Sequence, residues 1–157
     1  MKIITGDLLT QDVACIVNPW NVNIIPRWLL LPAGVSGQLK KKAGPEPFRE
    51  LARFGWLRPG SAVLTGGGLL NKPVIHVAGL NLLWRSSESL VFRCTRSALT
   101  LAGEKGLRTV ALPLIGAGTG GLSEAQSRLA IETAVNMSRY KGEVRLIIRP
   151  ESHRIYL

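Results

Sequence analysis

The fold is decided by the stretch Thr109-Val110-Ala111-Leu112-Pro113-Leu114-Ile115-Gly116-Ala117-Gly118-Thr119-Gly120-Gly121-Leu122-Ser123. Residues 109–114 are almost entirely apolar, which predicts a strand buried on both faces of a sheet. The next eight residues hold four glycines and predict a tight loop. Ser123 begins a helix, because Gln126 three residues later completes a capping box. A strand that leads through a short loop into a helix is typical of an α/β domain.

The rest of the chain repeats this alternation of strands and helices. Strands are predicted at residues 2–6, 14–18, 62–65, 73–78, 109–114 and 144–149, and helices at residues 35–43, 48–54, 87–105 and 123–140. The longest helix carries an apolar stripe at helical spacing, formed by Leu90, Cys94, Ala98, Leu101 and Ala102. The pattern predicts residues 1–157 as one α/β domain, with helices on both faces of a mostly parallel sheet.

The composition excludes several classes of protein. The chain has 157 residues, of which 46% are apolar, so it can bury a core without a disulfide or a metal. Its longest near-apolar run, residues 28–35, falls far short of the roughly 18 residues of a membrane span. The opening segment is too short and too polar for a signal peptide. We therefore expect a cytoplasmic protein with no membrane partner.

The net charge favours anionic partners. Lys and Arg total 20 and Asp and Glu total 10, which gives +10. Nucleic acids and nucleotides are attracted to such a surface, although an idle basic surface explains the same surplus. Three of the arginines, Arg85, Arg93 and Arg96, surround one predicted helix.

The cysteines and histidines do not form a recognisable metal site. Neither Cys15 nor Cys94 has a metal-binding spacing, and both fall in apolar segments. His76 and His153 lie far apart in the sequence and have no carboxylate companions. We expect two buried thiols, no metal and no cofactor. A Cys-His nucleophile pair that includes His76 is the alternative.

Two loops follow strands at the edge where parallel sheets bind ligands, residues 18–37 and residues 115–122. The glycines of the second loop let backbone N–H groups converge on an anion. The first loop ends in Gly34-Val35-Ser36-Gly37, which opens a helix and leaves N–H groups free. Two such loops imply that a diphosphate binds between them. Tight packing of the chain is the alternative explanation of the glycines in the second loop. The amides of Asn18 and Asn21 are suited to ribose hydroxyls, unless they cap the turn locally.

The first loop also contains an apolar insert, residues 24–32. So much apolar surface should not remain in water beside a polar site. Three alternatives stay open: the insert covers the ligand, packs beneath the edge of the domain, or forms a dimer or partner contact.

Together these segments resemble the macrodomain, the ADP-ribose-binding module, over nearly the whole chain. Five motifs occur in the family's order: Gly6-Asp7-Leu8-Leu9, Val17-Asn18-Pro19-Trp20-Asn21, Gly34-Val35-Ser36-Gly37 with Ala43-Gly44, Val74-Ile75-His76-Val77, and the run from Pro113 to Gly121. The resemblance implies an α/β/α sandwich of three layers with a mixed, mostly parallel central sheet. It also implies ADP-ribose as the ligand, without a further cofactor.

The resemblance assigns roles to individual residues. Asp7 would bond the adenine amine beside the backbone of Leu8, and Asn21 would face the distal ribose. Asn18 joins the expected ligand set from its place at the strand end. The other members of this set are Ala33, Gly34, Val35 and Ser36 in the first loop and Ile115, Gly116, Ala117, Gly118, Thr119 and Gly120 in the second.

Three departures from the family pattern leave catalysis open. Hydrolytic members commonly carry an Asp where this chain has Ser36, and no carboxylate occurs between Asp12 and Glu46. A serine can position a water but does not readily take its proton at pH 7. Asn21 and Ser36 therefore remain as the catalytic candidates. Many members also carry an aromatic residue where this chain has Gly120, and the apolar insert lengthens the first loop.

Three functions follow from these observations. The first is an ADP-ribose-binding macrodomain, which either hydrolyses ADP-ribose from protein, nucleic acid or small esters or only reads it. The second is nucleic-acid recognition driven by the charge of +10. The third is an interaction module that uses residues 24–32 as its contact surface.

Overall fold

A six-stranded sheet forms the centre of the computed structural model, which describes residues 1–21, 34–80 and 85–150. The strands are β1 (Lys2–Thr5), β2 (Cys15–Asn21), β3 (Ala62–Thr65), β4 (Val74–Leu80), β5 (Thr109–Leu112) and β6 (Glu143–Ile148). Their order across the sheet is β1-β6-β5-β2-β4-β3, and every neighbouring pair is parallel except β3 with β4. The predicted mixed, mostly parallel sheet is confirmed.

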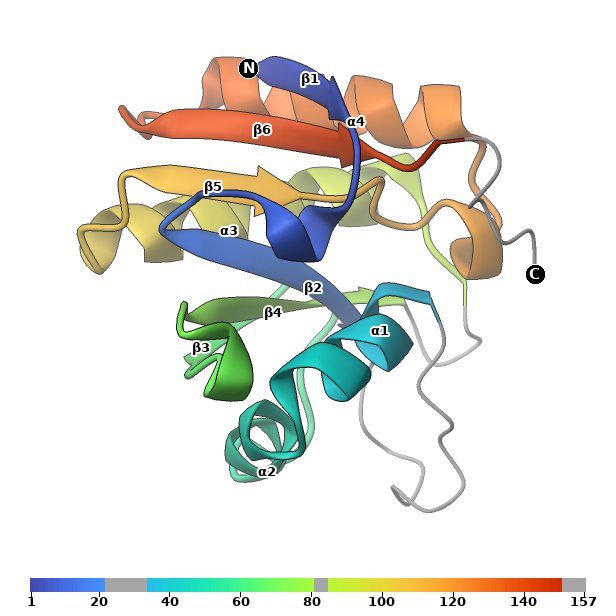
Figure 1. Ribbon diagram of the computed structural model, residues 1–157. Helices are drawn as coiled ribbons and strands as arrows, with labels where there is room; N and C mark the ends of the chain where they lie inside the picture. The colour runs from blue at the N-terminus through green and yellow to red at the C-terminus, as the bar shows by residue number, and fades with distance from the viewer. Residues whose placement is uncertain (22–33, 81–84, 151–157) are drawn as a thin grey trace.

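Helices cover both faces of this sheet (Figure 1). One layer holds α1 (Gly34–Ala43) and α2 (Glu46–Ala52), and the other holds α3 (Glu88–Glu104) and α4 (Glu124–Met137). Successive residues of β2 serve opposite layers: Cys15 and Val17 join the core beneath α3 and α4, whereas Ile16 joins the core beneath α1 and α2. A strand buried on both faces therefore has a continuous apolar sequence. The expected α/β/α sandwich is confirmed.

Both long helices begin after a serine cap, and the sequence predicts the one at Ser123. Ser123 Oγ accepts from the Gln126 N–H at 3.1 Å, and Gln126 Oε1 accepts from the Ser123 N–H at 3.0 Å, which confirms the capping box. Ser87 Oγ accepts from the Leu90 N–H at 3.1 Å and caps α3. These bonds satisfy N–H groups that a first helical turn leaves free.

None of the helices in the described ranges has both the length and the apolar character needed to cross a membrane.

β2 continues beyond the point where its pairing with β5 ends. β2 runs to Asn21, beyond its predicted end at residue 18, whereas β5 ends at Leu112, earlier than predicted. The pairing of the two strands is confined to Cys15 and Ile16 of β2, and the later residues of β2 pair with β4 alone. Pro19 is tolerated there, because a proline fits a segment that has one strand neighbour better than one that has two.

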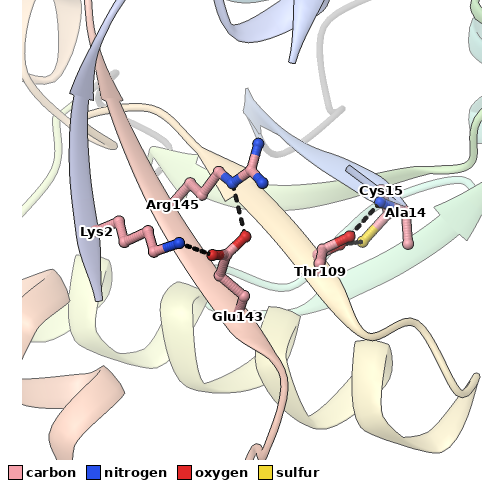
Figure 2. A network of polar contacts seen from close by, with 6 residues as sticks. All are labelled: Lys2, Ala14, Cys15, Thr109, Glu143 and Arg145. Carbon is pink, nitrogen blue, oxygen red and sulfur yellow. Dashed lines mark hydrogen bonds and ion pairs between the residues drawn. The ribbon is translucent and has the colours of Figure 1, made fainter. Parts of the chain in front are cut away.

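Two sets of polar contacts lie at the amino ends of the strands, one between β1 and β6 and the other between β5 and the start of β2 (Figure 2). Glu143 accepts from Lys2 Nζ at 2.5 Å and from Arg145 Nε at 2.7 Å. Thr109 Oγ1 accepts from the Ala14 N–H at 2.6 Å. The hydrogen bonds from Lys2 and then Arg145 hold the pKa of the Glu143 carboxyl below its ordinary range. The two sets join β1 to β6 and β5 to the start of β2, at the edge of the sheet opposite to the loops discussed below.

Replacing Glu143 with glutamine is expected to make stability less dependent on pH. A carboxyl with a lowered folded pKa stabilises the fold above its unfolded pKa, about 4.3, and loses this contribution as the pH falls through the folded value. The wild type should therefore melt at a higher temperature than Glu143→Gln near pH 7, with the difference vanishing in strong acid. Thermal melts of both proteins from strong acid to neutral pH measure the effect. Glu104→Gln, at the exposed end of α3, is the control. A difference that stays constant with pH would contradict the assignment.

Candidate functional site

The candidate site lies at the carboxyl edge of the sheet. β1, β6, β5, β2 and β4 run parallel, so their carboxyl ends share one edge. After β2 the chain forms β3 and β4 on one side of β2, and it then crosses to form β5 on the other side. The direction in which strands are added to the sheet therefore reverses between β2 and β5. Ligands of open α/β sheets bind at such points. The glycine loop after β5 and the segment after β2 both begin there.

A buried chain of four polar side chains lies beneath this edge. Asn18 Nδ2 is 3.0 Å from His76 Nδ1, and Asn18 Oδ1 accepts from Ser36 Oγ at 2.8 Å. At the other end, Thr65 Oγ1 is 2.8 Å from His76 Nε2. All four side chains are buried, and Asn18 and His76 are 0% exposed. The chain of contacts connects β2, α1, β4 and β3.

The hydrogen bonds allow one consistent arrangement of protons. Thr65 donates its single hydroxyl proton to Gly66 O at 2.9 Å, so its oxygen accepts from His76 Nε2–H. His76 Nδ1 then carries no proton and accepts from Asn18 Nδ2. Burial lowers the pKa of His76 to about 3, so the ring stays neutral at physiological pH. The amide oxygen, Asn18 Oδ1, accepts a hydrogen bond from the Ser36 hydroxyl.

Ser36 therefore directs its hydroxyl into the protein. Its proton is shared between Asn18 Oδ1 at 2.8 Å and Pro19 O at 3.0 Å, and the residue is 5% exposed. Because Ser36 is the third residue of α1, these bonds tie the first turn of the helix to the end of β2. Asn18 and Ser36 hold the start of α1 in place from below.

The glycine loop after β5 is anchored in a particular conformation. Gly116, Gly118 and Gly121 have φ angles of 79°, 75° and 84°, a region that favours glycine. The buried Ser127 Oγ of α4 donates to Ile115 O at 2.6 Å and fixes the start of the loop. The middle of the loop forms a short 3₁₀ turn, η4 (Gly118–Gly120). The helix that follows the loop thus supplies the side chain that holds it.

Ser86, a residue that sequence reasoning missed, packs against the same loop. Its N–H donates to Gly120 O at 2.9 Å. A Cβ atom at Gly120 would come within 2.9 Å of Ser86 Cβ, and one at Gly116 within 2.7 Å of Ser86 Oγ. Ser86 Oγ is buried and has no hydrogen-bond partner among the described residues. In the sequence, a serine just before the helix cap Ser87 carries no signal of this contact.

Gly120→Ala is expected to lower the free energy of unfolding by about 1–3 kcal/mol, the usual cost of overpacking. The added Cβ would force the loop and Ser86 apart. Ser86→Gly in the same chain should recover most of the loss, because it removes the atom that the new methyl meets. Urea unfolding of both single variants and the double variant measures the coupling between the two sites. Strictly additive losses would show that this contact does not limit residue 120.

Asp7 follows β1 at the same edge of the sheet. It is exposed, and its Oδ1 accepts from the Leu9 N–H at 2.9 Å, which caps the short turn η1 (Leu8–Thr10). Leu8 is buried in the core beneath α1 and α2. β1 is three positions from β2 in the sheet order, or about 14 Å at the usual strand spacing. Asp7 thus lies on the same edge of the sheet as the ends of β2 and β5, but well apart from them.

Parts of the predicted site are described only as backbone or not at all. The apolar insert and residue 33 fall in residues 22–33, outside the described ranges. Three predicted residues are placed by their backbone: Asn21 ends β2, Gly34 begins α1 and Thr119 lies in η4. Val35 is half-buried and packs against the core beneath α1 and α2.

Both cysteines are buried free thiols, as expected. Burial raises the pKa of each thiol to about 12. Cys94 Sγ lies 3.3 Å from Ala78 O, and Cys15 Sγ lies 3.7 Å from Thr109 O. Since both ring nitrogens of His76 are bonded within the buried chain, the alternative of a Cys-His nucleophile pair is wrong.

Known proteins resemble this chain in sequence and in fold. The profile of the family described as Macro domain matches residues 17–131. A macro domain-containing protein of Streptomyces nogalater is 34% identical over 160 residues, which cover 94% of this chain and 84% of the relative. An O-acetyl-ADP-ribose deacetylase of Enterobacter sp. is 32% identical over 143 residues, covering 85% and 76%. A mutant Oceanobacillus iheyensis macrodomain with ADPR has a TM-score of 0.80 at 25% identity, covering 96% of this chain and 85% of that one. The chain therefore belongs to the macrodomain family.

Proposed function

We propose that the protein binds ADP-ribose along the carboxyl edge of its sheet. The observation that carries this proposal is the end of β2–β5 pairing at Ile16, although β2 continues to Asn21. Beyond this point Ser36 holds the start of α1 against Pro19 of β2, and Ser127 holds the start of the glycine loop after β5. The structural neighbour that contains ADPR supports the same class of ligand.

Each part of the ligand would meet a different strand end. Asp7, after β1, would accept a hydrogen bond from the adenine amine. The backbone N–H groups of residues 115–120 would bind the diphosphate, since successive N–H groups in such a turn suit an anion. Gly34 and Val35 would add N–H groups from the start of α1. Asn21, at the end of β2, would bond the distal ribose.

The geometry favours binding without hydrolysis. The Ser36 hydroxyl donates inward and is not placed to take a proton from water. No carboxylate occurs between Asp12 and Glu46 to act as a local base. Hydrolysis is the second candidate, because a relative is named O-acetyl-ADP-ribose deacetylase. In that case Asn21 and the ligand's own phosphate would hold the attacking water.

Turnover assays distinguish the two candidates. The purified protein is incubated with ADP-ribosylated protein, with DNA that carries a terminal ADP-ribose, and with O-acetyl-ADP-ribose. Flat time courses on all three substrates, together with measurable ADP-ribose binding, are expected for a reader. Release of ADP-ribose at a rate proportional to protein concentration would overturn the reader assignment in favour of the hydrolase.

Asp7→Ala is expected to weaken ADP-ribose binding about tenfold, or about 1.4 kcal/mol, the scale of one hydrogen bond to a charged group. Asp12→Ala is the matched control, because Asp12 is also exposed and precedes the amino end of β2. Calorimetric titration of both variants measures the difference. Equal affinities for the two variants would remove Asp7 from the adenine site.

A further inference from the structure

A groove of about 500 Å³ lies between α3 and the segment that leads into β3. One wall is formed by residues 59–62, and the other is the face of α3 that carries Arg93, Arg96, Ser97 and Thr100. We call this feature the β3–α3 groove. Neither the buried chain nor the glycine loop contributes to its lining.

The β3–α3 groove is basic. Arg93 and Arg96 are exposed, and neither forms an ion pair with a carboxylate in the part of the chain that the structure describes. Arg58 is exposed immediately beside the groove wall. Glu104 is the one carboxylate among the described lining residues, and it lies at the far end of α3. Two arginines and one glutamate thus line the groove, and Arg58 precedes its first lining residue in the sequence.

Backbone groups of Gly60 and Ser61, in the wall opposite α3, are already bonded. The Gly60 N–H donates to Ala78 O at 3.0 Å, and Gly60 O accepts from Ser97 Oγ at 2.7 Å. Ser61 O accepts from the Ala78 N–H at 3.1 Å. An extended peptide that adds to a strand needs such backbone groups to be free. At Gly60 and Ser61 the groove therefore offers side-chain charge and not free backbone groups.

The groove begins near the carboxyl edge of the sheet. Its wall is bonded to Ala78, close to the end of β4, and α3 starts at Glu88 and carries Arg93 in its second turn. Arg93 lies across this wall, since a Cβ at Gly60 would come within 3.2 Å of Arg93 Cβ and 3.5 Å of its Nη1. An anion in the groove would thus approach the edge that holds the candidate site.

We propose that the β3–α3 groove binds the phosphodiester backbone of a single-stranded nucleic acid. Guanidinium groups match phosphate oxygens with paired N–H donors. The described lining residues include no aromatic side chain on which a base could stack, so the arginines would contact phosphates, which carry no sequence information. An acidic peptide is the other anionic polymer, but the bonded backbone groups of Gly60 and Ser61 give it fewer groups with which to pair. This proposal does not depend on ADP-ribose binding.

Fluorescence anisotropy with a labelled mixed-sequence strand of about 16 nucleotides, at about 50–200 mM salt, tests the proposal. The variant Arg93→Glu with Arg96→Glu is compared with Arg139→Glu with Lys141→Glu. Arg139 and Lys141 are exposed near the amino end of β6, at the opposite edge of the sheet. Each double variant reverses two positive charges, so both lower the net charge by the same amount. Arg93→Gln with Arg96→Gln provides a milder change, and thermal melts check that every variant folds.

The groove variant is expected to bind the strand at least about tenfold more weakly than the wild type and to show a shallower dependence on salt. The control variant should lose about twofold or less, and the glutamine variant should fall between them. Equal losses in the two charge-reversal variants would assign the effect to net charge and overturn the groove. No binding by the wild type at low salt would overturn it as well, as would tighter binding of poly-glutamate than of the strand. A separate ADP-ribose titration of the groove variant shows whether the other site is intact.

Discussion

Replacing Asn18 with leucine is expected to lower the free energy of unfolding by about 2–3 kcal/mol. The substitution removes the only donor to His76 Nδ1 among the described residues and one of the two acceptors of the Ser36 hydroxyl. An unsatisfied buried acceptor costs far more than a lost surface bond. The midpoint of thermal unfolding should fall by roughly 4–12 °C for a chain of this size. Urea and thermal unfolding measure the effect.

Asn136→Leu is the matched control for this substitution, because Asn136 is exposed on α4. Its free energy of unfolding should stay within about 0.5 kcal/mol of the wild type. The double variant Asn18→Leu with His76→Leu should be more stable than the sum of the two single losses predicts, because it removes both partners of one buried bond. Additive losses, or a wild-type stability for Asn18→Leu, would contradict the buried chain as described.

Gly118→Glu is expected to weaken ADP-ribose binding by about 100-fold or more, which corresponds to about 2.7 kcal/mol. Gly118 is exposed with a φ of 75°, so any side chain strains the loop at the point where its N–H groups would meet the diphosphate. The added carboxylate would also repel the phosphates. Calorimetric titration with ADP-ribose measures the loss.

Gly106→Glu is the control that distinguishes an effect on the ligand site from the general effect of backbone strain and added charge. Gly106 has a φ of 67° and, like Gly118, has nothing within 4 Å of an added Cβ, but it follows α3 at the amino edge of the sheet. It therefore receives a similar backbone strain and the same charge far from the proposed ligand. Its ADP-ribose affinity should match that of the wild type. Equal affinities for Gly118→Glu and Gly106→Glu would remove the glycine loop from the site.

The features that could be predicted from the sequence are those set by neighbours in the chain. The capping box at Ser123 involves residues three apart, so the sequence shows both partners together. The apolar runs of β2 and β5 signal burial on two faces for the same reason. The six strands and four helices follow from such local patterns, and their ends differ by a few residues.

The features that could not be predicted depend on contacts between distant segments. β2 extends through Pro19 because β4 pairs with it, and a proline in isolation predicts the end of a strand. Asn18 looks like a ribose ligand at a strand end, yet α1 covers it and its amide meets Ser36 and His76. The contact of Ser86 with the glycine loop depends equally on the path of the chain after β4.

The proposed site combines both kinds of information. The sequence motifs predict which loops carry the backbone donors, and the structure places the ends of those loops at the switch between β2 and β5. The inward hydroxyl of Ser36 is the one structural detail that changes the balance between a hydrolase and a reader, since its proton is already donated within the protein.

Calorimetric titration with ADP-ribose, with AMP as the comparison ligand, tests the central claim most directly. AMP contains the adenine and the first phosphate but lacks the second phosphate and the distal ribose. A pocket that uses both loops should bind ADP-ribose at least about tenfold more tightly than AMP, a difference of about 1.4 kcal/mol. Equal affinities for the two ligands, or no binding of ADP-ribose, would contradict a site that spans the carboxyl edge from Asp7 to the glycine loop.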